Sequence, residues 1–135
     1  ITKEDLQSRI SNFVDKANLV SESIQFDFKA EENTKKDLKL TSIEGMNIYR
    51  IIQEALNNAL KYAEASKIEV YINTVRNILN ISILDNGKGF NFSDVELGNG
   101  INNMKKRAHD IQLEIELQSS INAGTTVKLK KELNT

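Results

Sequence analysis

The chain has 135 residues, of which 39% are hydrophobic and 27% are charged, and its formal net charge is −1. This length is that of one domain able to bury a core, so we expect residues 1–135 to form a single domain. A charge so close to zero gives no general attraction to nucleic acid or to an acidic membrane surface, and neither is expected as a partner. The absence of cysteine excludes a disulfide framework and a cysteine-based zinc site. No run of about 18 apolar residues occurs, which excludes a transmembrane helix.

The first part of the chain predicts two helices separated by a strand. Apolar residues recur at helical spacing over residues 2–17 and alternate with polar ones over residues 24–28, which predicts a helix and then a short strand. The charged stretch over residues 29–39 is expected to be a loop. Thr41 and Glu44 then match a capping box, and they begin a long helix with one apolar stripe.

The second part of the chain predicts four strands and one helix. Alternating apolar residues predict strands over residues 68–74, 78–84, 113–118 and 125–129, and helical spacing predicts a short helix over residues 101–111. Three helices and about five strands in one short chain predict an α+β fold. We expect a two-layer α/β sandwich in which the helices cover one face of a mixed, mostly antiparallel sheet.

The long helix carries a group of polar residues beside its apolar stripe. Glu54, Asn58, Lys61 and Tyr62 share one face, because they occupy positions i, i+4, i+7 and i+8 of the helix. Two adjacent asparagines, Asn57 and Asn58, cost a helix some stability. This face is either a solvated helix surface or a polar site. In a site, the amide oxygen of Asn58 could bind a hard cation such as Mg²⁺ beside the carboxylate of Glu54.

Asp85 continues the alternation of the apolar positions in the strand before it, so its carboxylate points where the core residues point. An inward carboxylate needs a hydrogen-bonding partner. Gly87 and Gly89 remove side chains beside it and would let a flat ligand approach closely. A carboxylate accepts from an exocyclic amine and repels a carbonyl, which would select adenine over guanine. The alternative is that Asp85, Asn86 and Gly87 simply form a turn.

Four of the six glycines lie in one polar stretch, residues 86–100, which we expect to be a long loop. Gly98 and Gly100 directly precede a predicted helix, where small residues leave backbone N–H groups open to an anion such as phosphate. A flexible loop would also supply this pattern. Gly124 and Thr125 open the last strand, either as a hairpin turn or as a further part of the same site.

Four motifs follow one another along the chain: Glu54 with Asn58, Asp85 with Gly87 and Gly89, Gly98 with Gly100, and Gly124 with Thr125. Together they resemble the motifs of the GHKL superfamily, whose Bergerat-type ATP-binding fold is shared by gyrase, the ninety-kilodalton chaperone, histidine kinases and MutL. Residues 49–63 are similar to the N box of sensor histidine kinases of the nitrate-sensor/desaturase-sensor type. Residues 98–108 resemble the G2 box of these kinases with the helix that follows it. The resemblance covers roughly residues 20–131, nearly the whole chain.

The resemblance implies a role for each matching residue. Asn58 would bind the Mg²⁺ that bridges the ATP phosphates, and Glu54 would orient or deprotonate the attacking group or support the metal shell. Asp85 would take the adenine amine, with Gly87 and Gly89 shaping its pocket. The resemblance assigns further nucleotide contacts or lid positions to Lys61, Tyr62, Gly98, Gly100, Ile101 and Thr125.

The resemblance also implies a reaction and its partners. It describes the catalytic domain of a two-component sensor histidine kinase, which binds ATP and Mg²⁺ and has residues 86–100 as a mobile ATP lid. Such a domain donates the γ-phosphate to a histidine on an upstream dimerisation helix, from which a response regulator receives it. The chain begins with Ile1, and we expect it to be a piece of a longer protein that carries those helices. We expect it in the cytoplasm, either free or as the cytoplasmic part of a membrane-bound sensor.

The only histidine, His109, lies at the end of the predicted G2 helix and is not expected to be the phosphoacceptor. The isolated chain should therefore bind ATP without phosphorylating itself. Two departures from the family are visible: Tyr62 stands where many relatives have histidine, and residues 109–112 stand where many have a pair of glycines. An anti-sigma-factor-type serine kinase and a non-catalytic nucleotide-binding regulatory module are the alternative functions.

Overall fold

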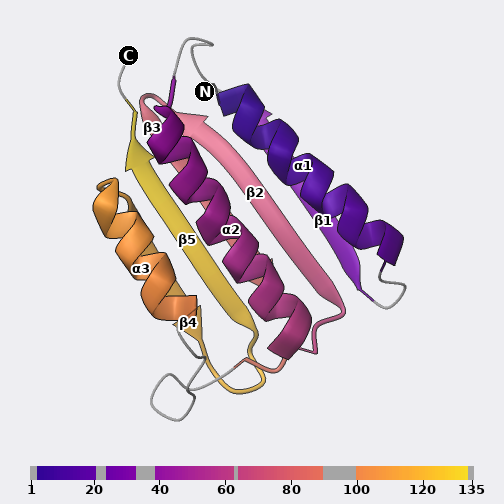
Figure 1. The fold of residues 1–135 in the computed structure, drawn as a ribbon. Coiled ribbons are helices and arrows are strands. Elements are labelled where there is room, and N and C mark those ends of the chain that lie inside the picture. Colours follow the sequence, from indigo (N-terminus) through magenta and orange to yellow (C-terminus); the bar gives the residue numbers. More distant parts are fainter. Residues whose placement is uncertain (1–2, 21–23, 33–38, 63, 90–99, 134–135) are drawn as a thin grey trace.

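A computed structural model describes residues 3–20, 24–32, 39–62, 64–89 and 100–133, and within them the chain forms three helices and a five-stranded sheet (Figure 1). All three helices pack on one face of the sheet. None of these helices is long and apolar enough to cross a membrane. The elements are α1 (Lys3–Val20), β1 (Gln25–Glu32), α2 (Ser42–Tyr62), β2 (Lys67–Val75), β3 (Ile78–Asp85), α3 (Gly100–Asp110), β4 (Glu114–Ser119) and β5 (Thr125–Glu132).

The sheet has the strand order β1-β2-β3-β5-β4. β1 and β2 run parallel, and the other three pairs of neighbouring strands are antiparallel. The α+β fold expected from the sequence is therefore confirmed, with its mixed sheet and one layer of helices. β1 and β2 can run parallel because α2, which follows β1 and precedes β2 in the sequence, carries the chain back along the sheet before β2 begins.

The core lies between the helix layer and the sheet. Leu6 and Ile10 of α1 and Ile48, Ile51 and Leu56 of α2 have no measurable exposure to solvent. The burial of each such side chain away from water stabilises the fold by about 1.5–3 kcal/mol. The apolar stripes read from the sequence of the two helices thus face the sheet, and the polar sides of these helices face outward.

The capping box at the start of α2 is present as predicted. The backbone N–H of Thr41 donates to Oε1 of Glu44 at 2.8 Å, and the backbone N–H of Glu44 donates to Oγ1 of Thr41 at 3.0 Å. Two N–H groups that the helix itself cannot pair are satisfied in this way. The start of the longest helix is therefore set by its own local sequence.

One sequence prediction about the strands is wrong. Residues 29–32 were expected to belong to a loop, but β1 continues through them to Glu32. The cause is the parallel ladder with β2, which pairs Lys29 with Tyr71 and Glu32 with Thr74. Backbone pairing with a strand distant in the sequence thus outweighs the weak preference of charged residues for strands.

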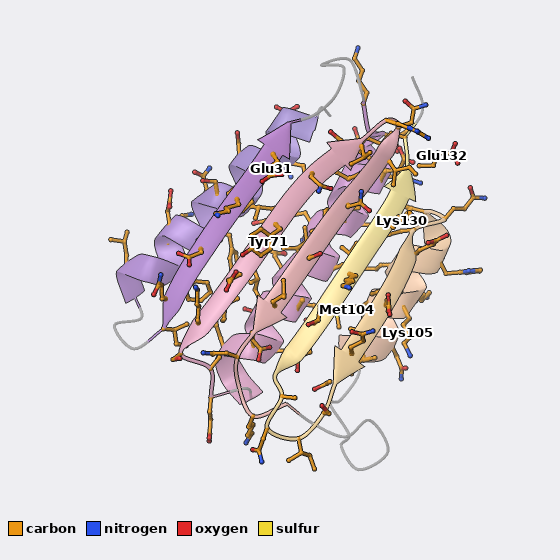
Figure 2. All side chains as sticks on the ribbon, turned by 180° about the vertical axis from the view of Figure 1, so that it is seen from behind. Glu31, Tyr71, Met104, Lys105, Lys130 and Glu132 are labelled. Atoms are coloured by element: carbon orange, nitrogen blue, oxygen red, sulfur yellow. The ribbon has the colours of Figure 1, made fainter. Side chains whose placement is uncertain are left out.

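The face of the sheet opposite the helices is mostly polar. Figure 2 shows Glu31, Lys130 and Glu132 on this face, and all three are exposed. Charges of opposite sign lie directly across from each other where β4 pairs with β5, as in the pair of Glu114 and Lys130. In the described residues this face therefore needs no covering layer.

The turn after α3 contains one residue in the left-handed conformation. Gln112 has a positive φ of 54°. The N–H of Gln112 donates to the carbonyl of His109 at 3.2 Å, and the N–H of Leu113 donates to the carbonyl of Ala108 at 2.8 Å. These two bonds form a Schellman cap in which Gln112 takes the left-handed position that glycine usually occupies.

Candidate functional site

The residues singled out in the sequence gather at one end of the sheet. At the lower end of Figure 1 lie the last turn of α2, the end of β3, the start of β5 and the start of α3. These are the elements that carry the four sequence motifs. Antiparallel pairing causes this, because β3 ends where β5 begins. The opposite end of the sheet carries none of the motif residues.

Asp85 is the last residue of β3, and it is held between two strands. It pairs with Ile68 of β2 on one side and with Thr125 of β5 on the other. Its Oδ1 accepts a hydrogen bond from the backbone N–H of Gly87 at 2.9 Å. Burial raises the pKa of the Asp85 carboxyl, although the backbone N–H groups of Gly87 and Thr125 act in the opposite direction. The carboxyl is thus partly withdrawn from water and held in place.

Two glycines beside Asp85 are required by the backbone. Gly89 and Gly124 have positive φ values of 62° and 74°. A Cβ on Gly124 would overlap the carbonyl oxygen of Asp85, and a Cβ on Gly89 would overlap that of Ser120. The segment after β3 and the turn between β4 and β5 can therefore approach each other only because both positions lack a side chain. Gly87 is buried in the same place.

Glu54 and Asn58 lie one turn apart on α2, and both are partly exposed. Among the described residues, neither side chain makes a hydrogen bond or an ion pair. Their oxygens are thus available and of the type that Mg²⁺ binds. The described residues contain no group of three acidic, histidine or cysteine side chains that could hold a metal. A donor set this small suits Mg²⁺, which usually takes most of its ligands from water and phosphate.

A pocket of about 220 Å³ lies between α2 and α3 beside Glu54. Nη1 of Arg107, which lines this pocket from α3, donates to Oδ1 of Asn47, a nearly buried residue of α2, at 3.1 Å. The two arginines of this pocket were not predicted as site residues, although helical spacing places them on the faces of α2 and α3 that meet. The pocket is lined by Arg50, Gln53, Glu54, Asn57, Asn103, Met104 and Arg107.

The profile of the family described as histidine kinase-, DNA gyrase B- and HSP90-like ATPases matches residues 43–135. The chain belongs to this ATPase family. The GHKL resemblance and the expected ATP-binding domain are thereby confirmed. The match includes every element of the site described above, from α2 to β5.

Curated relatives from this ATPase family are sensor proteins. VraS of Staphylococcus saprophyticus is 37% identical over 89 residues, which cover 65% of this chain and 26% of VraS. The sensor histidine kinase LiaS of Bacillus subtilis is 36% identical over 85 residues, which cover 62% of this chain and 24% of LiaS. The match thus covers about a quarter of the length of these relatives.

Solved structures of the ATPase family share the fold. The histidine kinase domain of the blue-light-activated kinase EL346 from Erythrobacter litoralis superposes with a TM-score of 0.77 at 18% identity, covering 95% of this chain and 61% of that one. The catalytic domain of histidine kinase ThkA superposes with a TM-score of 0.74 at 13% identity, covering 98% and 92%. At such identities these structures support the fold alone.

The remaining predicted residues are only partly described. Gly100 is the first residue of α3, and Ile101 is half-buried against the core. Lys61 and Tyr62 belong to the last turn of α2, but their side chains lie outside the described part of the structure. Gly98 and most of the expected lid, residues 90–99, also lie outside it.

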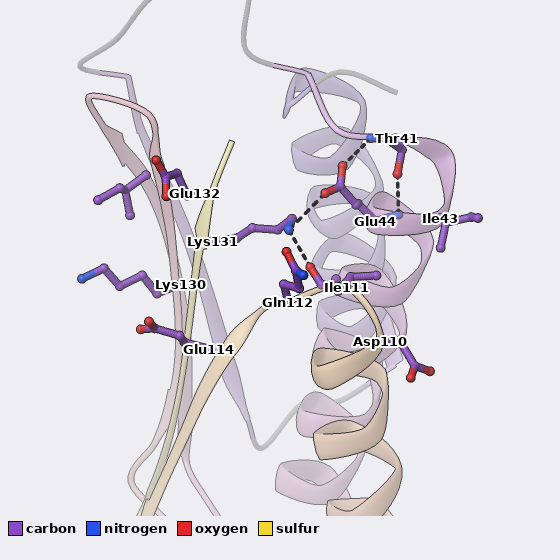
Figure 3. Close-up of a pocket in the computed structure, with 11 residues that line it drawn as sticks. Thr41, Ile43, Glu44, Asp110, Ile111, Gln112, Glu114, Lys130, Lys131 and Glu132 are labelled. Atoms are coloured by element: carbon purple, nitrogen blue, oxygen red, sulfur yellow. Dashed lines mark hydrogen bonds and ion pairs between the residues drawn. The ribbon is translucent and has the colours of Figure 1, made fainter. Parts of the chain in front are cut away.

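A second pocket, of about 780 Å³, lies at the opposite end of the sheet (Figure 3). Lys131, which is only 7% exposed, joins three elements there. Its Nζ lies 3.0 Å from Oε2 of Glu44 and donates to the carbonyl of Ile111 at 2.6 Å. The buried charge is thus paired, as burial requires. This pocket contains none of the residues that the ATPase motifs single out.

Proposed function

We propose that this chain is the ATP-binding catalytic domain of a two-component sensor histidine kinase. It transfers the γ-phosphate of ATP to a histidine on dimerisation helices outside this chain, and a response regulator then receives the phosphoryl group. The observation that carries the proposal is the half-buried Asp85 carboxyl at the end of β3, which accepts a hydrogen bond from the backbone N–H of Gly87. The relatives named as sensor proteins favour a histidine kinase over the serine kinase and the regulatory module.

The adenine would bind at Asp85. The carboxylate accepts a hydrogen bond from the exocyclic amine of adenine and repels the carbonyl that guanine has at that position. Thr125 lies directly across from Asp85, and its Oγ1 is 2.8 Å from Oγ of Ser119. The two hydroxyl groups offer further hydrogen bonds to the base or to water between them.

The phosphates would bind between α2 and the start of α3. Asn58 and Glu54 supply oxygens for Mg²⁺, which neutralises the charge of the phosphates when it is bound. Glu54 also orients the attacking histidine and accepts its proton. Backbone N–H groups at Gly98 and Gly100 would be open to the phosphates, and residues 86–100 would form a lid over them. Lys61, Tyr62 and Ile101 flank the nucleotide.

The phosphoacceptor is supplied from outside this chain. His109 lies exposed at the end of α3, whereas the site faces the start of that helix. We therefore expect no self-phosphorylation by the chain alone. Its place of action is the cytoplasm, where ATP and response regulators are available.

Calorimetric titration with ATP in the presence of Mg²⁺ tests the proposal. The unchanged chain should bind ATP, and removal of Mg²⁺ should weaken binding. Asp85→Asn replaces the acceptor that faces the adenine amine by an amide and should weaken binding by about tenfold or more. Asp15→Asn, an exposed substitution on α1, is the matched control and should bind as the unchanged chain does. Equal affinities for Asp85→Asn and the unchanged chain would refute the adenine site.

A further inference from the structure

We propose that Asn86 is a positioning residue that fixes Asp85 against the start of β2 and thereby sets the preference for adenine. This inference rests on the proposed function, since it deepens the role of Asp85 in the same site. Asn86 is the residue directly after Asp85, and the sequence suggested only a turn there. The hydrogen bonds of its side chain do not belong to a local turn.

The carboxamide of Asn86 is bonded at both ends. Its Oδ1 accepts from the backbone N–H groups of Ser66 and Lys67, each at 2.9 Å. Its Nδ2 donates to Oγ of Ser66 at 2.8 Å. The backbone N–H of Asn86 also donates to the carbonyl of Lys67 at 3.2 Å. Four hydrogen bonds thus join one residue to the same two positions, and we refer to these bonds as the Asn86 clamp.

The residues that the clamp joins lie about 20 positions apart in the sequence. An asparagine that only shapes a turn bonds to the backbone two residues onward. Asn86 instead bonds across to the segment that leads from α2 into β2. Only a side chain with an acceptor and a donor at this reach can make all three side-chain bonds, because aspartate lacks the donor and alanine lacks both.

The clamp holds one of the two sides of Asp85. On the β5 side, Gly124 packs against the carbonyl of Asp85. On the β2 side, Ser66 and Lys67 immediately precede Ile68, the partner of Asp85 in the ladder. The same segment follows the last turn of α2, the helix that carries Asn58. The clamp therefore fixes the carboxylate relative to both its neighbouring strand and the helix at the phosphate end.

A loss of the clamp should affect the base more than the phosphates. The hydrogen bond from an adenine amine to a carboxylate depends on distance and angle, so a small displacement of Asp85 weakens it. The phosphates contact other elements and are common to all nucleoside triphosphates. The clamp bonds are exposed to solvent, so each contributes little to folding. Asn86→Ala should therefore fold and lose discrimination between bases.

The test compares the affinities for Mg-ATP and Mg-GTP by calorimetry. In the unchanged chain ATP should bind more tightly, and in Asn86→Ala the ratio of the two affinities should fall by about tenfold. Asn80→Ala is the matched control, because Asn80 is a partly exposed asparagine of β3, the strand that precedes Asn86, and lies remote from Asp85. Its ratio should stay as in the unchanged chain.

The outcomes separate the two proposals. If the unchanged chain prefers Mg-ATP and Asn86→Ala keeps the same ratio of affinities for Mg-ATP and Mg-GTP, this inference is overturned and the proposed function stands. A chain that binds neither nucleotide would overturn both. A fall of the same size in Asn80→Ala would also overturn the inference, because the loss would then not depend on the clamp.

A second measurement uses the unchanged chain and does not depend on a variant that folds. If the clamp favours adenine binding, linkage requires that bound adenine strengthens the clamp. Saturating Mg-ATP should therefore slow hydrogen exchange at the backbone amides of Ser66 and Lys67 more than saturating Mg-GTP does. The amides of the capping box at the other end of α2 serve as the reference. Equal exchange at Ser66 and Lys67 with both nucleotides would overturn the proposal.

Discussion

Asp85 ends β3 with its carboxyl half-buried, and burial raises its pKa even though the backbone N–H groups of Gly87 and Thr125 donate to it. Under the proposed function the ionised carboxylate accepts a stronger hydrogen bond from the adenine amine than the protonated carboxyl does. Because the pKa is raised, acidification should weaken ATP binding at a higher pH than an ordinary aspartate would require. Calorimetry across the acid range checks this. In Asp85→Asn the residual affinity should lack this pH dependence, and an identical profile in both chains would contradict the assignment.

The same raised pKa has the opposite sign for folding. The folded chain binds this proton more tightly than the unfolded chain does. The contribution of Asp85 to the free energy of unfolding therefore decreases as pH rises through the two pKa values. As pH falls, nucleotide affinity should therefore decrease while the contribution of Asp85 to the free energy of unfolding increases. A loss of affinity caused by this group is thus distinguished from a loss of stability.

Gln112 carries a strain that a glycine would remove. A residue with a side chain costs about 1 kcal/mol or more in the left-handed conformation that it takes after α3. Gln112→Gly should therefore raise the free energy of unfolding by about 1 kcal/mol, which a denaturant titration measures. Gln118→Gly, at an exposed position of β4, should lower it. A decrease in both variants would show that the Gln112 side chain makes a contact that outweighs its backbone strain.

Sequence reasoning succeeded where the physical cause is local. The capping box was predictable, because Thr41 and Glu44 satisfy each other within one turn. The inward direction of Asp85 was predictable, because the period of a strand continues to its last residue. Arg107 was not recognised, since its pocket exists only when α3 lies beside α2. The Asn86 clamp was also beyond reach, because its partners are distant in the sequence.

At the scale of elements, Lys131 joins β5 to the start of α2 and to the turn after α3. Removal of one partner of a buried ion pair leaves the other charge uncompensated. Lys131→Met should therefore lower the free energy of unfolding by about 3 kcal/mol in a denaturant titration. Addition of Glu44→Gln to this variant removes the orphaned charge and keeps the capping box, because glutamine also caps from that position. It should restore part of the loss, and no restoration would contradict the pairing.

The stability contributed by the ion pair of Glu44 and Lys131 depends on pH. Burial alone would raise the pKa of Glu44, but hydrogen bonds from Thr41 and the charge of Lys131 outweigh it, and the pKa is lowered. A lowered carboxyl pKa contributes stability that is present above the pKa of the unfolded chain. This contribution is lost as pH falls through the folded value, and Glu44→Gln should lack that part of the acid response.

At the scale of the whole molecule, the proposed function places the nucleotide site in this chain and the phosphoacceptor outside it. Incubated with ATP, it should take up no acid-labile phosphate, and His109→Ala should change nothing. With a separately prepared dimerisation fragment that bears the histidine, transfer should occur. Glu54→Gln keeps an oxygen that Mg²⁺ can bind but removes the base, so it should slow transfer by about 10²-fold and change ATP affinity much less. Phosphate on the chain alone would contradict the assignment.

The edges of the sheet have a further consequence. β1 and β4 are its outer strands, and each carries charged side chains on the face that no helix covers. Glu114 and Glu116 alternate along β4, so a second copy of β4 added antiparallel to the first would bring glutamates close to glutamates. The repulsion would oppose edge-to-edge growth of the sheet from one molecule to the next. The glutamates of β4 should therefore oppose aggregation through this edge of the sheet.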